Sequence, residues 1–294
     1  MHCLNLKLTY DCTNNCSFCF SSYLKENIIT YDGLSDAVIR GFNNGCRELV
    51  LSGGEPTLLP DTIESLLTLA EQLGYEKYII QTNGSGLSTN DQLVEFLDEL
   101  AKKKELCISF SIHGHCAEIH DRMSSTNGAF ELLIKAMDKI KSTSCLIYTN
   151  TVISRLNIDH LEEVGKLCHS YGAKVIQFSM MHLDSPSDLS TGLIEAVQAV
   201  KKVSNKIEHD VLKTEGIPYC LMHGIETCVG ESFWPNELDL YNKENDYMSA
   251  FSQLENGMRW KSPSCIKCIM NEICMGIWKE HANEYREASI RPIC

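Results

Sequence analysis

The stretch YDCTNNCSFCF, residues 10–20, places Cys12, Cys16 and Cys19 in one short polar turn. The turn follows an apolar run, residues 4–10, that has the length and composition of a strand. A structural zinc site closes with four protein ligands, and this turn supplies only three cysteines. In an iron–sulfur cubane each thiolate binds one iron, so three thiolates leave the fourth iron open. The turn therefore predicts a cluster site with one free coordination position.

Two other interpretations of this turn stay open. Zinc would need a fourth protein ligand nearby, and Asp11 and His2 are the candidates in the sequence. The three cysteines could also be small core residues, but a polar turn rich in asparagine is a poor place for packing.

Outward from this turn, short β-branched runs alternate with longer stretches of helical period. Such alternation predicts βαβ units and a parallel sheet. Six units fit a partial (β/α)6 barrel, an α/β fold, better than a complete eight-fold barrel. The expected strands are residues 4–10, 48–52, 77–82, 106–112, 146–153 and 174–180, and the expected helices are 33–44, 60–73, 89–103, 129–141, 157–171 and about 190–209.

The alternation stops near residue 210, which suggests two domains. We expect residues 1–210 to form the barrel and residues 211–294 to form a small C-terminal subdomain. The second segment contains Gly-Ile-Pro and Trp-Pro turns and another cluster of cysteines. No repeat of fixed period is present in the sequence.

Composition excludes several classes of protein. Of the 294 residues, 44 % are hydrophobic and 22 % charged, which argues against disorder. A net charge of −13 without a Lys/Arg cluster argues against binding to nucleic acid or to anionic membrane surfaces. The N-terminus lacks a signal-peptide pattern and no apolar run is long enough to span a membrane, so we expect a cytoplasmic protein. Fifteen cysteines in a reducing compartment do not indicate a disulfide framework. Those at short spacings are candidate metal ligands, and the remaining ones, Cys46 among them, are expected as small buried residues.

The cysteine spacing C-x3-C-x-Φ-C, with an aromatic residue before the last cysteine, resembles the signature of the radical S-adenosylmethionine (SAM) superfamily. A second segment, ELVLSGGEPTL at residues 48–58, is similar to the Gly-Gly-Glu-Pro motif that follows the second strand of that family. Glycines allow close approach of the backbone to a ligand, and a carboxylate can accept hydrogen bonds from an ammonium. The cofactor-binding residues expected from these motifs are Phe18, Gly53, Gly54, Glu55 and Pro56.

The resemblance implies both the cofactors and the reaction. In the family, the amino and carboxylate groups of SAM chelate the open iron of the 4Fe–4S cluster. The reduced cluster cleaves SAM to methionine and a 5′-deoxyadenosyl radical, which takes a hydrogen atom from the substrate. The protein orients the groups and excludes water, while the cofactor supplies the difficult step.

Polar residues also follow later strands. Asn83, Ser111 and Asn150 lie at the ends of the third, fourth and fifth expected strands, where the family contacts ribose, adenine and substrate. Capping or turn roles are the alternative for each of these residues.

His113 lies where many relatives carry an aspartate, and it is the candidate for a catalytic acid or base. A polar residue that only braces the turn is the alternative, and the one that we favour. His115 and His120 are expected at a helix start or on the surface, and His182 follows the sixth strand without an assigned role.

Near the C-terminus, Cys265, Cys268 and Cys274 have the spacing C-x2-C-x5-C. It resembles the SPASM and twitch extensions of the family, which hold auxiliary iron–sulfur clusters. Trp278 stands where a full SPASM element has a further cysteine, so the resemblance implies one auxiliary 4Fe–4S cluster rather than two. A zinc knuckle is the alternative.

The fourth ligand of this second cluster is open. Cys220, which follows a proline turn, is the first choice, and Cys228 and Cys294 are the others. If none of them binds, an open iron is left for substrate.

Fold and motif do not choose the reaction. Relatives with such extensions often modify ribosomal peptides, so we expect oxidative modification or crosslinking of a peptide. Dehydrogenation or rearrangement of a small molecule is the alternative, and a non-catalytic iron–sulfur or zinc sensor is the alternative from another class. An electron donor such as flavodoxin or ferredoxin is expected. The first strand begins near residue 4, so a peptide would bind directly or through a separate leader-peptide-binding protein.

Overall fold

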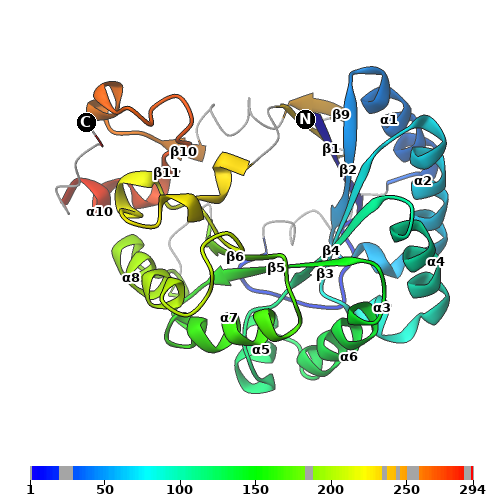
Figure 1. Cartoon of the computed structure of the whole chain (residues 1–294), viewed down its shortest axis with the longest axis horizontal. Helices are drawn as coiled ribbons and strands as arrows, with labels where there is room; N and C mark the ends of the chain where they lie inside the picture. The colour runs from blue at the N-terminus through cyan, green and yellow to red at the C-terminus, as the bar shows by residue number, and fades with distance from the viewer. Residues whose placement is uncertain are drawn as a thin grey trace. The chain divides into compact units, whose positions relative to one another are not determined.

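The computed structural model describes residues 2–19, 29–182, 188–233, 237–242, 246–249, 258–287 and 293 (Figure 1). The chain divides into two compact units. Unit 1 consists of residues 1–111, 124–148 and 235–251, and unit 2 consists of residues 112–123, 149–234 and 252–294. Strand β5, Leu146–Ile153, begins in unit 1 and ends in unit 2.

The sheet of unit 1 has the strand order β5-β4-β3-β2-β1-β8-β9. Strand β1 pairs in parallel with β2 on one side and with β8 on the other, and β9 runs antiparallel to β8. Alternate residues of β1 are fully buried, as a strand with one face on a helix layer requires. The strands are β1 His2–Thr9, β2 Cys46–Gly53, β3 Lys77–Thr82, β4 Glu105–Ser111, β8 Glu237–Asn242 and β9 Asp246–Ser249.

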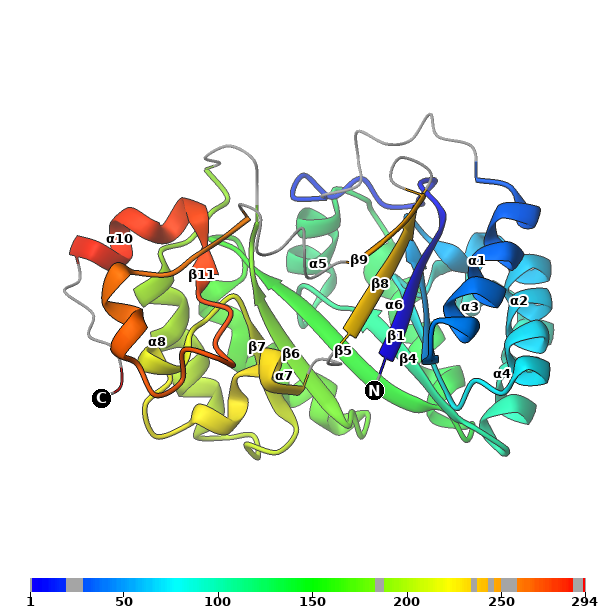
Figure 2. The same cartoon turned by 90° about the horizontal axis from the view of Figure 1, so that it is seen from above.

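Helices cover one side of these strands (Figures 1 and 2). Thr30 caps the first helix by accepting a hydrogen bond from Gly33 N–H. The second helix begins with Pro60 and ends at Gly74 in the left-handed conformation, a pairing typical of helix ends. The helices are α1 Tyr31–Asn43, α2 Pro60–Leu73, α3 Ser85–Thr89, α4 Asp91–Ala101 and α6 Ala129–Lys141, with the 3₁₀ turn η2 Pro56–Leu58.

Unit 2 continues the βα alternation with the strand order β7-β6-β5. Helices α7 and α8 pack on β6 and on each other, and Gly165 allows their close approach, since a Cβ there would lie 3.1 Å from Val203 Cγ1. The elements are α5 Ala117–Ser124, η3 Ile158–His160, α7 Leu161–Ser170, β6 Val175–Met180, α8 Leu193–Ser204 and β7 Leu212–Glu215.

The remainder of unit 2 is built on short elements. Trp278 is buried there, with the Arg259 guanidinium 3.6 Å from its ring centre. Arg259 also forms an ion pair with the buried Glu231, at 3.2 Å. The elements are η4 Tyr219–Leu221, η5 Glu226–Cys228, η6 Gly230–Phe233, η8 Pro263–Lys267, η9 Lys279–His281, α10 Ala282–Glu287 and the antiparallel pair β10 Arg259–Trp260 and β11 Ile277–Trp278.

The α/β class and the six expected strands are confirmed, two of them with the expected bounds and the others with ends shifted by at most two residues. The sheet has eight parallel strands because β7 and β8 add to those expected, so the strand pattern does not stop at residue 210. Strand β7 has only four residues, and β8 lies far in sequence from its partner β1. A subdomain boundary at residue 210 stays a prediction.

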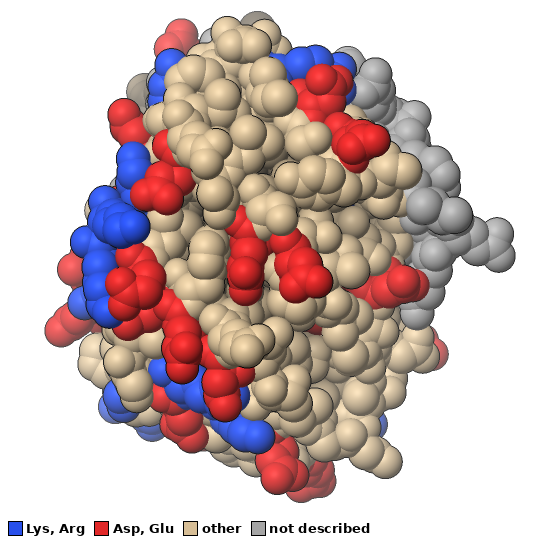
Figure 3. All heavy atoms as spheres, turned by 90° about the vertical axis from the view of Figure 1, so that its right-hand side faces the viewer, with Lys and Arg blue, Asp and Glu red and all other residues tan. Residues whose placement is uncertain are grey.

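The face that carries α1, α2 and α4 shows acidic side chains with basic ones among them (Figure 3). This mixture agrees with the negative net charge of the chain. In the part of the chain that the structure describes, no helix has the length and apolar character needed to cross a bilayer.

Candidate functional site

The cysteine loop leaves the carboxyl end of β1 and is fastened to the segment that follows β2. Gly54 N–H donates to Thr9 O at 2.6 Å, and Glu55 N–H donates to Asp11 O at 2.7 Å. Because β1 and β2 are parallel neighbours, their carboxyl ends lie side by side and bring the two motifs together. The sequence prediction that these motifs share one site is consistent with this contact.

Both glycines of the Gly-Gly-Glu-Pro segment are required by this contact. Gly53 has a φ of +129°, and a Cβ there would lie 2.3 Å from Thr9 O. A Cβ on Gly54 would lie 2.2 Å from Asp11 O. The sequence suggested glycines that let the backbone approach a ligand, whereas in the structure they let it approach the cysteine loop.

Glu55 connects the segments beside the cysteine loop through hydrogen bonds to its carboxylate. Its side chain is fully buried. Oε1 accepts hydrogen bonds from the N–H and O–H of Thr57 and from Thr82 O–H, and Oε2 accepts one from Asn83 N–H at 2.6 Å. Burial raises the pKa of Glu55, and these four donors oppose that shift. The carboxylate thus joins the end of β3 to the loop after β2, and its predicted contact with an ammonium stays a prediction.

Asn83 holds the cysteine loop from the end of β3. Its Nδ2 donates to Thr13 Oγ1 at 3.0 Å and lies 3.5 Å from Cys12 Sγ, while its Oδ1 accepts from Ser85 N–H. Thr13 O–H donates in turn to Ser85 Oγ at 2.8 Å. The predicted site residue therefore orients a cysteine of the loop in this structure, and a contact with ribose stays a prediction.

A second anchor holds the middle of the loop. Asn15 N–H donates to Ser124 O at 3.0 Å and lies 3.2 Å from Thr126 Oγ1. Cys19 N–H donates to Cys16 O, which closes the turn between these two ligand candidates. All three cysteines are partly exposed, as a group that binds a ligand from outside requires.

The sulfur atoms of the loop are spaced more widely than three ligands of one zinc ion. Zn–S bonds of about 2.3 Å place tetrahedral ligand sulfurs roughly 3.8 Å apart. Among the described residues, just one group of three His, Cys, Asp or Glu ligand atoms lies within 4.8 Å of one another, and it contains none of the loop cysteines. A cubane distributes its thiolates over separate irons and so fits wider spacing. His2 is excluded as a fourth zinc ligand because it lies at the opposite end of β1, roughly 20 Å along the strand.

The remaining predicted positions of unit 1 lie as follows. Phe18 is half-buried within the loop, and Pro56 is buried as the first residue of η2. Ser111 is the half-buried last residue of β4.

In unit 2, Asn150 belongs to a polar cluster on three neighbouring strands. Its Oδ1 accepts a hydrogen bond from Ser179 O–H at 2.7 Å and lies 3.4 Å from Gln177 Nε2. Both of these side chains also reach Glu215 Oε2, at 2.9 and 3.1 Å. The sequence reasoning missed Glu215 because it did not predict β7, whose alternation is only four residues long.

His113 is buried, with a backbone N–H bond to His120 Nδ1 at 3.2 Å and with its own Nδ1 accepting from Val152 N–H at 3.3 Å. Burial and the neighbouring His120 lower the pKa of His113 to about 3, and burial lowers the pKa of His120 to about 4. Both rings are neutral near pH 7, which favours the bracing role over proton transfer. Of the two positions expected for His120, the surface is wrong because that side chain is fully buried, whereas the helix start is confirmed, since the residue lies in the first turn of α5.

The second set of cysteines lines one pocket in unit 2. Cys220, Cys265, Cys268 and Cys274 all contribute to its wall, together with Trp260 and Tyr285 among others. Cys220 Sγ lies 3.1 Å from Tyr285 OH, and burial raises the pKa of the Cys220 and Cys265 thiols.

The two alternatives to Cys220 differ from it. Cys228 is fully buried and its thiol lies 3.8 Å from His209 O, and it is not part of the pocket wall. Cys294 lies outside the described residues. Trp278, at the position of the missing cysteine, packs beside His182, with ring centres 4.5 Å apart.

Comparisons with known proteins show the family of this chain. The profile of the Radical SAM superfamily matches residues 6–168. The chain is 27 % identical over 170 residues to the AdoMet-dependent heme synthase of Methanosarcina barkeri, covering 57 % of this chain and 47 % of that protein. It is 27 % identical over 175 residues to the mycofactocin maturase MftC of Mycobacterium tuberculosis, covering 58 % of this chain and 42 % of that protein. It thus spans less than half the length of both relatives.

Two solved structures share the fold. SuiB of Streptococcus suis bound to S-adenosylmethionine matches with a TM-score of 0.69 at 16 % identity, over 99 % of this chain and 76 % of that one. The enzyme anSMEcpe with bound AdoMet and Kp18Cys peptide matches with a TM-score of 0.58 at 21 % identity, over 69 % and 59 %.

Proposed function

Because the chain belongs to the radical SAM superfamily, we propose that Cys12, Cys16 and Cys19 hold a 4Fe–4S cluster whose open iron binds S-adenosylmethionine. We propose that the enzyme uses this pair to remove a hydrogen atom from a peptide and modify it oxidatively. The contact that carries the proposal is the pair of backbone bonds from Gly54 and Glu55 to the cysteine loop. It fixes the loop of ligands against the motif expected to hold the cofactor.

The chain's own residues have defined tasks in this proposal. Three thiols on one loop match the donor set of a cubane with one open iron. Asn83 and the backbone N–H of Asn14 point at Cys12 Sγ, at 3.5 and 3.4 Å, and donors of this kind stabilise a thiolate. Glu55 keeps the loops after β2 and β3 together, so that the ligands keep their geometry when a cofactor binds.

When both groups are bound, the cluster and S-adenosylmethionine supply a 5′-deoxyadenosyl radical. The cysteine loop would orient the cofactors. Glu55, Thr57 and Thr82 are buried beneath the loop and would exclude water from that side of the site.

We propose an auxiliary 4Fe–4S cluster held by Cys220, Cys265, Cys268 and Cys274. Their shared pocket supports it, and Cys220 is supported as the fourth ligand over Cys228. An auxiliary cluster suits an oxidative outcome, because a substrate radical must lose an electron before the product forms. An external electron carrier of the flavodoxin or ferredoxin type is part of the proposal.

Solved structures that share the fold support a peptide substrate. SuiB is solved with the precursor peptide SuiA, and anSMEcpe with the Kp18Cys peptide. The similarity to a heme synthase keeps a small-molecule substrate as the second candidate. A sensor that only binds a cluster is less favoured, because it has no need for a Gly-Gly-Glu-Pro segment built onto the loop.

Anaerobic reconstitution with iron and sulfide tests the proposal. We expect about eight irons per chain, as two cubanes require. With dithionite and S-adenosylmethionine, 5′-deoxyadenosine should appear in mass spectra, and the Cys12→Ala, Cys16→Ala and Cys19→Ala variants should produce none. Bound zinc in place of iron, with no cleavage, would overturn it.

A second variant separates cleavage from product formation. Cys265→Ala should still form 5′-deoxyadenosine but should stop the loss of two hydrogen atoms from a candidate peptide. Full turnover by this variant would refute the auxiliary role.

A further inference from the structure

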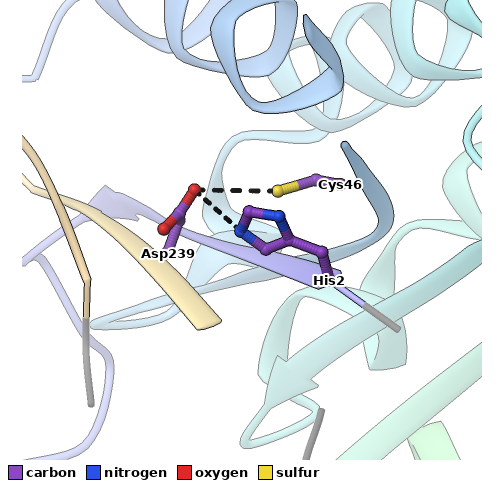
Figure 4. Close-up of side chains that lie close together, drawn as sticks. All are labelled: His2, Cys46 and Asp239. Atoms are coloured by element: carbon purple, nitrogen blue, oxygen red, sulfur yellow. Dashed lines mark hydrogen bonds and ion pairs between the residues drawn. The ribbon is translucent and has the colours of Figure 1, made fainter. Parts of the chain in front are cut away.

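Three potential metal ligands meet at the amino ends of strands β1, β2 and β8, away from the cysteine loop at the carboxyl end of β1 (Figure 4). His2 lies opposite Cys46 in the register of β1 and β2. Asp239 comes from β8, the neighbour of β1 on its other side. Strand pairing therefore brings together residues that are far apart in the sequence.

The distances between the three ligand atoms suit one ion. His2 Nε2 lies 2.9 Å from Asp239 Oδ2, and Cys46 Sγ lies 3.8 Å from the same oxygen. All three atoms lie within 4.8 Å of one another. Zinc bonds of about 2.0 Å to nitrogen or oxygen and about 2.3 Å to sulfur place tetrahedral ligand atoms roughly 3.3–3.7 Å apart. The observed 2.9 and 3.8 Å lie on either side of this spacing.

The orientation of the histidine is also that of a metal ligand. His2 Nδ1 lies 3.1 Å from the carbonyl oxygen of Asn44, which accepts hydrogen bonds only, so Nδ1 carries the proton. In a neutral ring Nε2 then presents its lone pair on the side of the Asp239 carboxylate. A ligating histidine commonly has its other nitrogen fixed by a backbone carbonyl in this way.

Two acceptors at 2.9 Å need a proton or a metal ion between them. A second proton on His2 is one solution, with the fully buried Cys46 thiol donating a hydrogen bond to the same oxygen. A metal ion is the other, and it would bind all three ligand atoms at once. A thiolate, an imidazole and a carboxylate together form a donor set that zinc prefers among abundant divalent ions. We therefore propose that His2, Cys46 and Asp239 bind a zinc ion.

The proposed zinc ion would have a structural role within unit 1. His2 and Asp239 side chains are 15 % and 13 % exposed, so a water molecule can reach the fourth coordination position. The ion would fasten β8 to β1 and β2, and it takes no part in the chemistry of the cysteine loop. Zinc is redox-inert, so it could sit in an enzyme that handles single electrons without side reactions.

Metal analysis of the full chain tests the site. The protein is first reconstituted with iron and sulfide, so that the cluster cysteines are occupied, and is then dialysed against micromolar zinc. We expect about one zinc per chain by mass spectrometry in the wild type. Cys46→Ser and Asp239→Asn should lose that zinc while their iron content stays unchanged. Cys107→Ser, a buried thiol of β4 outside the group, should keep both metals.

Cobalt(II) gives a second reading that does not depend on stability. In the cluster-loaded, zinc-free wild type, cobalt should add the absorption of a cobalt–thiolate site to the spectrum of the clusters. The difference spectrum should lack this absorption in Cys46→Ser and retain it in Cys107→Ser. Added zinc should also raise the thermal midpoint of the wild type and leave that of Asp239→Asn unchanged. Absence of zinc from the wild type, or its retention in Cys46→Ser and Asp239→Asn, would overturn the site and leave a protonated His2–Asp239 pair.

Discussion

At the scale of single residues, the candidate site depends on two glycines, Gly53 and Gly54, that have no Cβ atom. The cysteine loop and the segment after β2 touch through their backbones, and each of two glycines leaves room for a carbonyl oxygen of the other chain segment. A carbonyl in a hydrogen-bonded loop cannot give way as the end of a flexible side chain can. Any side chain at these positions therefore displaces the loop that carries the cluster ligands.

Gly54→Ala should lower the iron content of the reconstituted protein by the four irons of one cubane. The new Cβ would lie 2.2 Å from Asp11 O, and relief of such overpacking costs about 1–3 kcal/mol of stability and moves the loop. The matched control is Gly128→Ala, where φ is +81° but no atom lies within 4 Å. It should lose roughly 1–2 kcal/mol to backbone strain and keep its iron. Equal iron contents in the two variants would show that the close contact between Gly54 and the cysteine loop is not needed to hold the cluster.

Glu55→Gln should destabilise unit 1 by about 1.5–3 kcal/mol, the usual value for hydrogen bonds to a charged group. Both carboxylate oxygens accept from chain donors, so the amide NH₂ of glutamine must face one of them. Urea unfolding at neutral pH measures the loss, with the exposed Glu76→Gln as the control. A stability like that of the wild type would show that Glu55 does not hold the loops after β2 and β3 together.

At the scale of elements, α5 meets the segment after β4 through the two neutral histidines. Their pKa values in the folded chain, about 3 for His113 and about 4 for His120, lie below the ordinary value of 6.5. Below pH 6.5, His113 and His120 therefore bind protons in the unfolded chain but stay neutral in the folded chain. Folding stability is complete above that pH and is lost as the pH falls toward 4.

The free energy of unfolding should fall by about 1.4 kcal/mol per pH unit for each histidine between pH 6.5 and 4. His120→Gln should remove about half of this slope, because only His113 still resists protonation. Denaturant unfolding at pH 7.5, 6.0 and 5.0 measures it. An equal slope in wild type and variant would show that these histidines are not the groups that titrate.

The pocket of four cysteines gives a prediction about short elements. Cys220 lies within η4 and lines the pocket, whereas the thiol of Cys228, in η5, donates a hydrogen bond to His209 O outside it. Cys220→Ser should therefore lose iron faster than the wild type under a mild chelator, and Cys228→Ser should behave as the wild type. The reverse order would assign the fourth ligand to Cys228.

Strands and helices with strong periodicity could be predicted from the sequence, and the six βα units are confirmed. The candidate site could be predicted where chemistry determines spacing, as in the three cysteines and the Gly-Gly-Glu-Pro segment, and the binding roles of these residues stay predictions. It was missed where a partner is supplied by tertiary structure. Thr57 and Thr82 show no pattern that marks them as donors to Glu55, and Asp239 reaches His2 only because β8 pairs with β1.

At the scale of the whole chain, residues beyond 210 contribute to the parallel strands. In unit 1, β8 covers the outer edge of β1, and in unit 2, β7 covers β6. Both pairings leave backbone donors and acceptors exposed if the later residues are removed. This gives a direct test of the predicted boundary.

A fragment of residues 1–210 should aggregate, because it exposes the open edges of β1 and β6 to pairing with other chains. Light scattering and the soluble fraction after refolding measure this against the full chain. A longer fragment, residues 1–249, keeps β7 and both strands of the β8–β9 pair, and it should stay in solution. It should also retain about four irons, since the cysteine loop is intact and the pocket of Cys265, Cys268 and Cys274 is gone. A soluble 1–210 fragment that cleaves S-adenosylmethionine would establish the boundary at residue 210, and would show that β7 and β8 are additions to a core that folds without them.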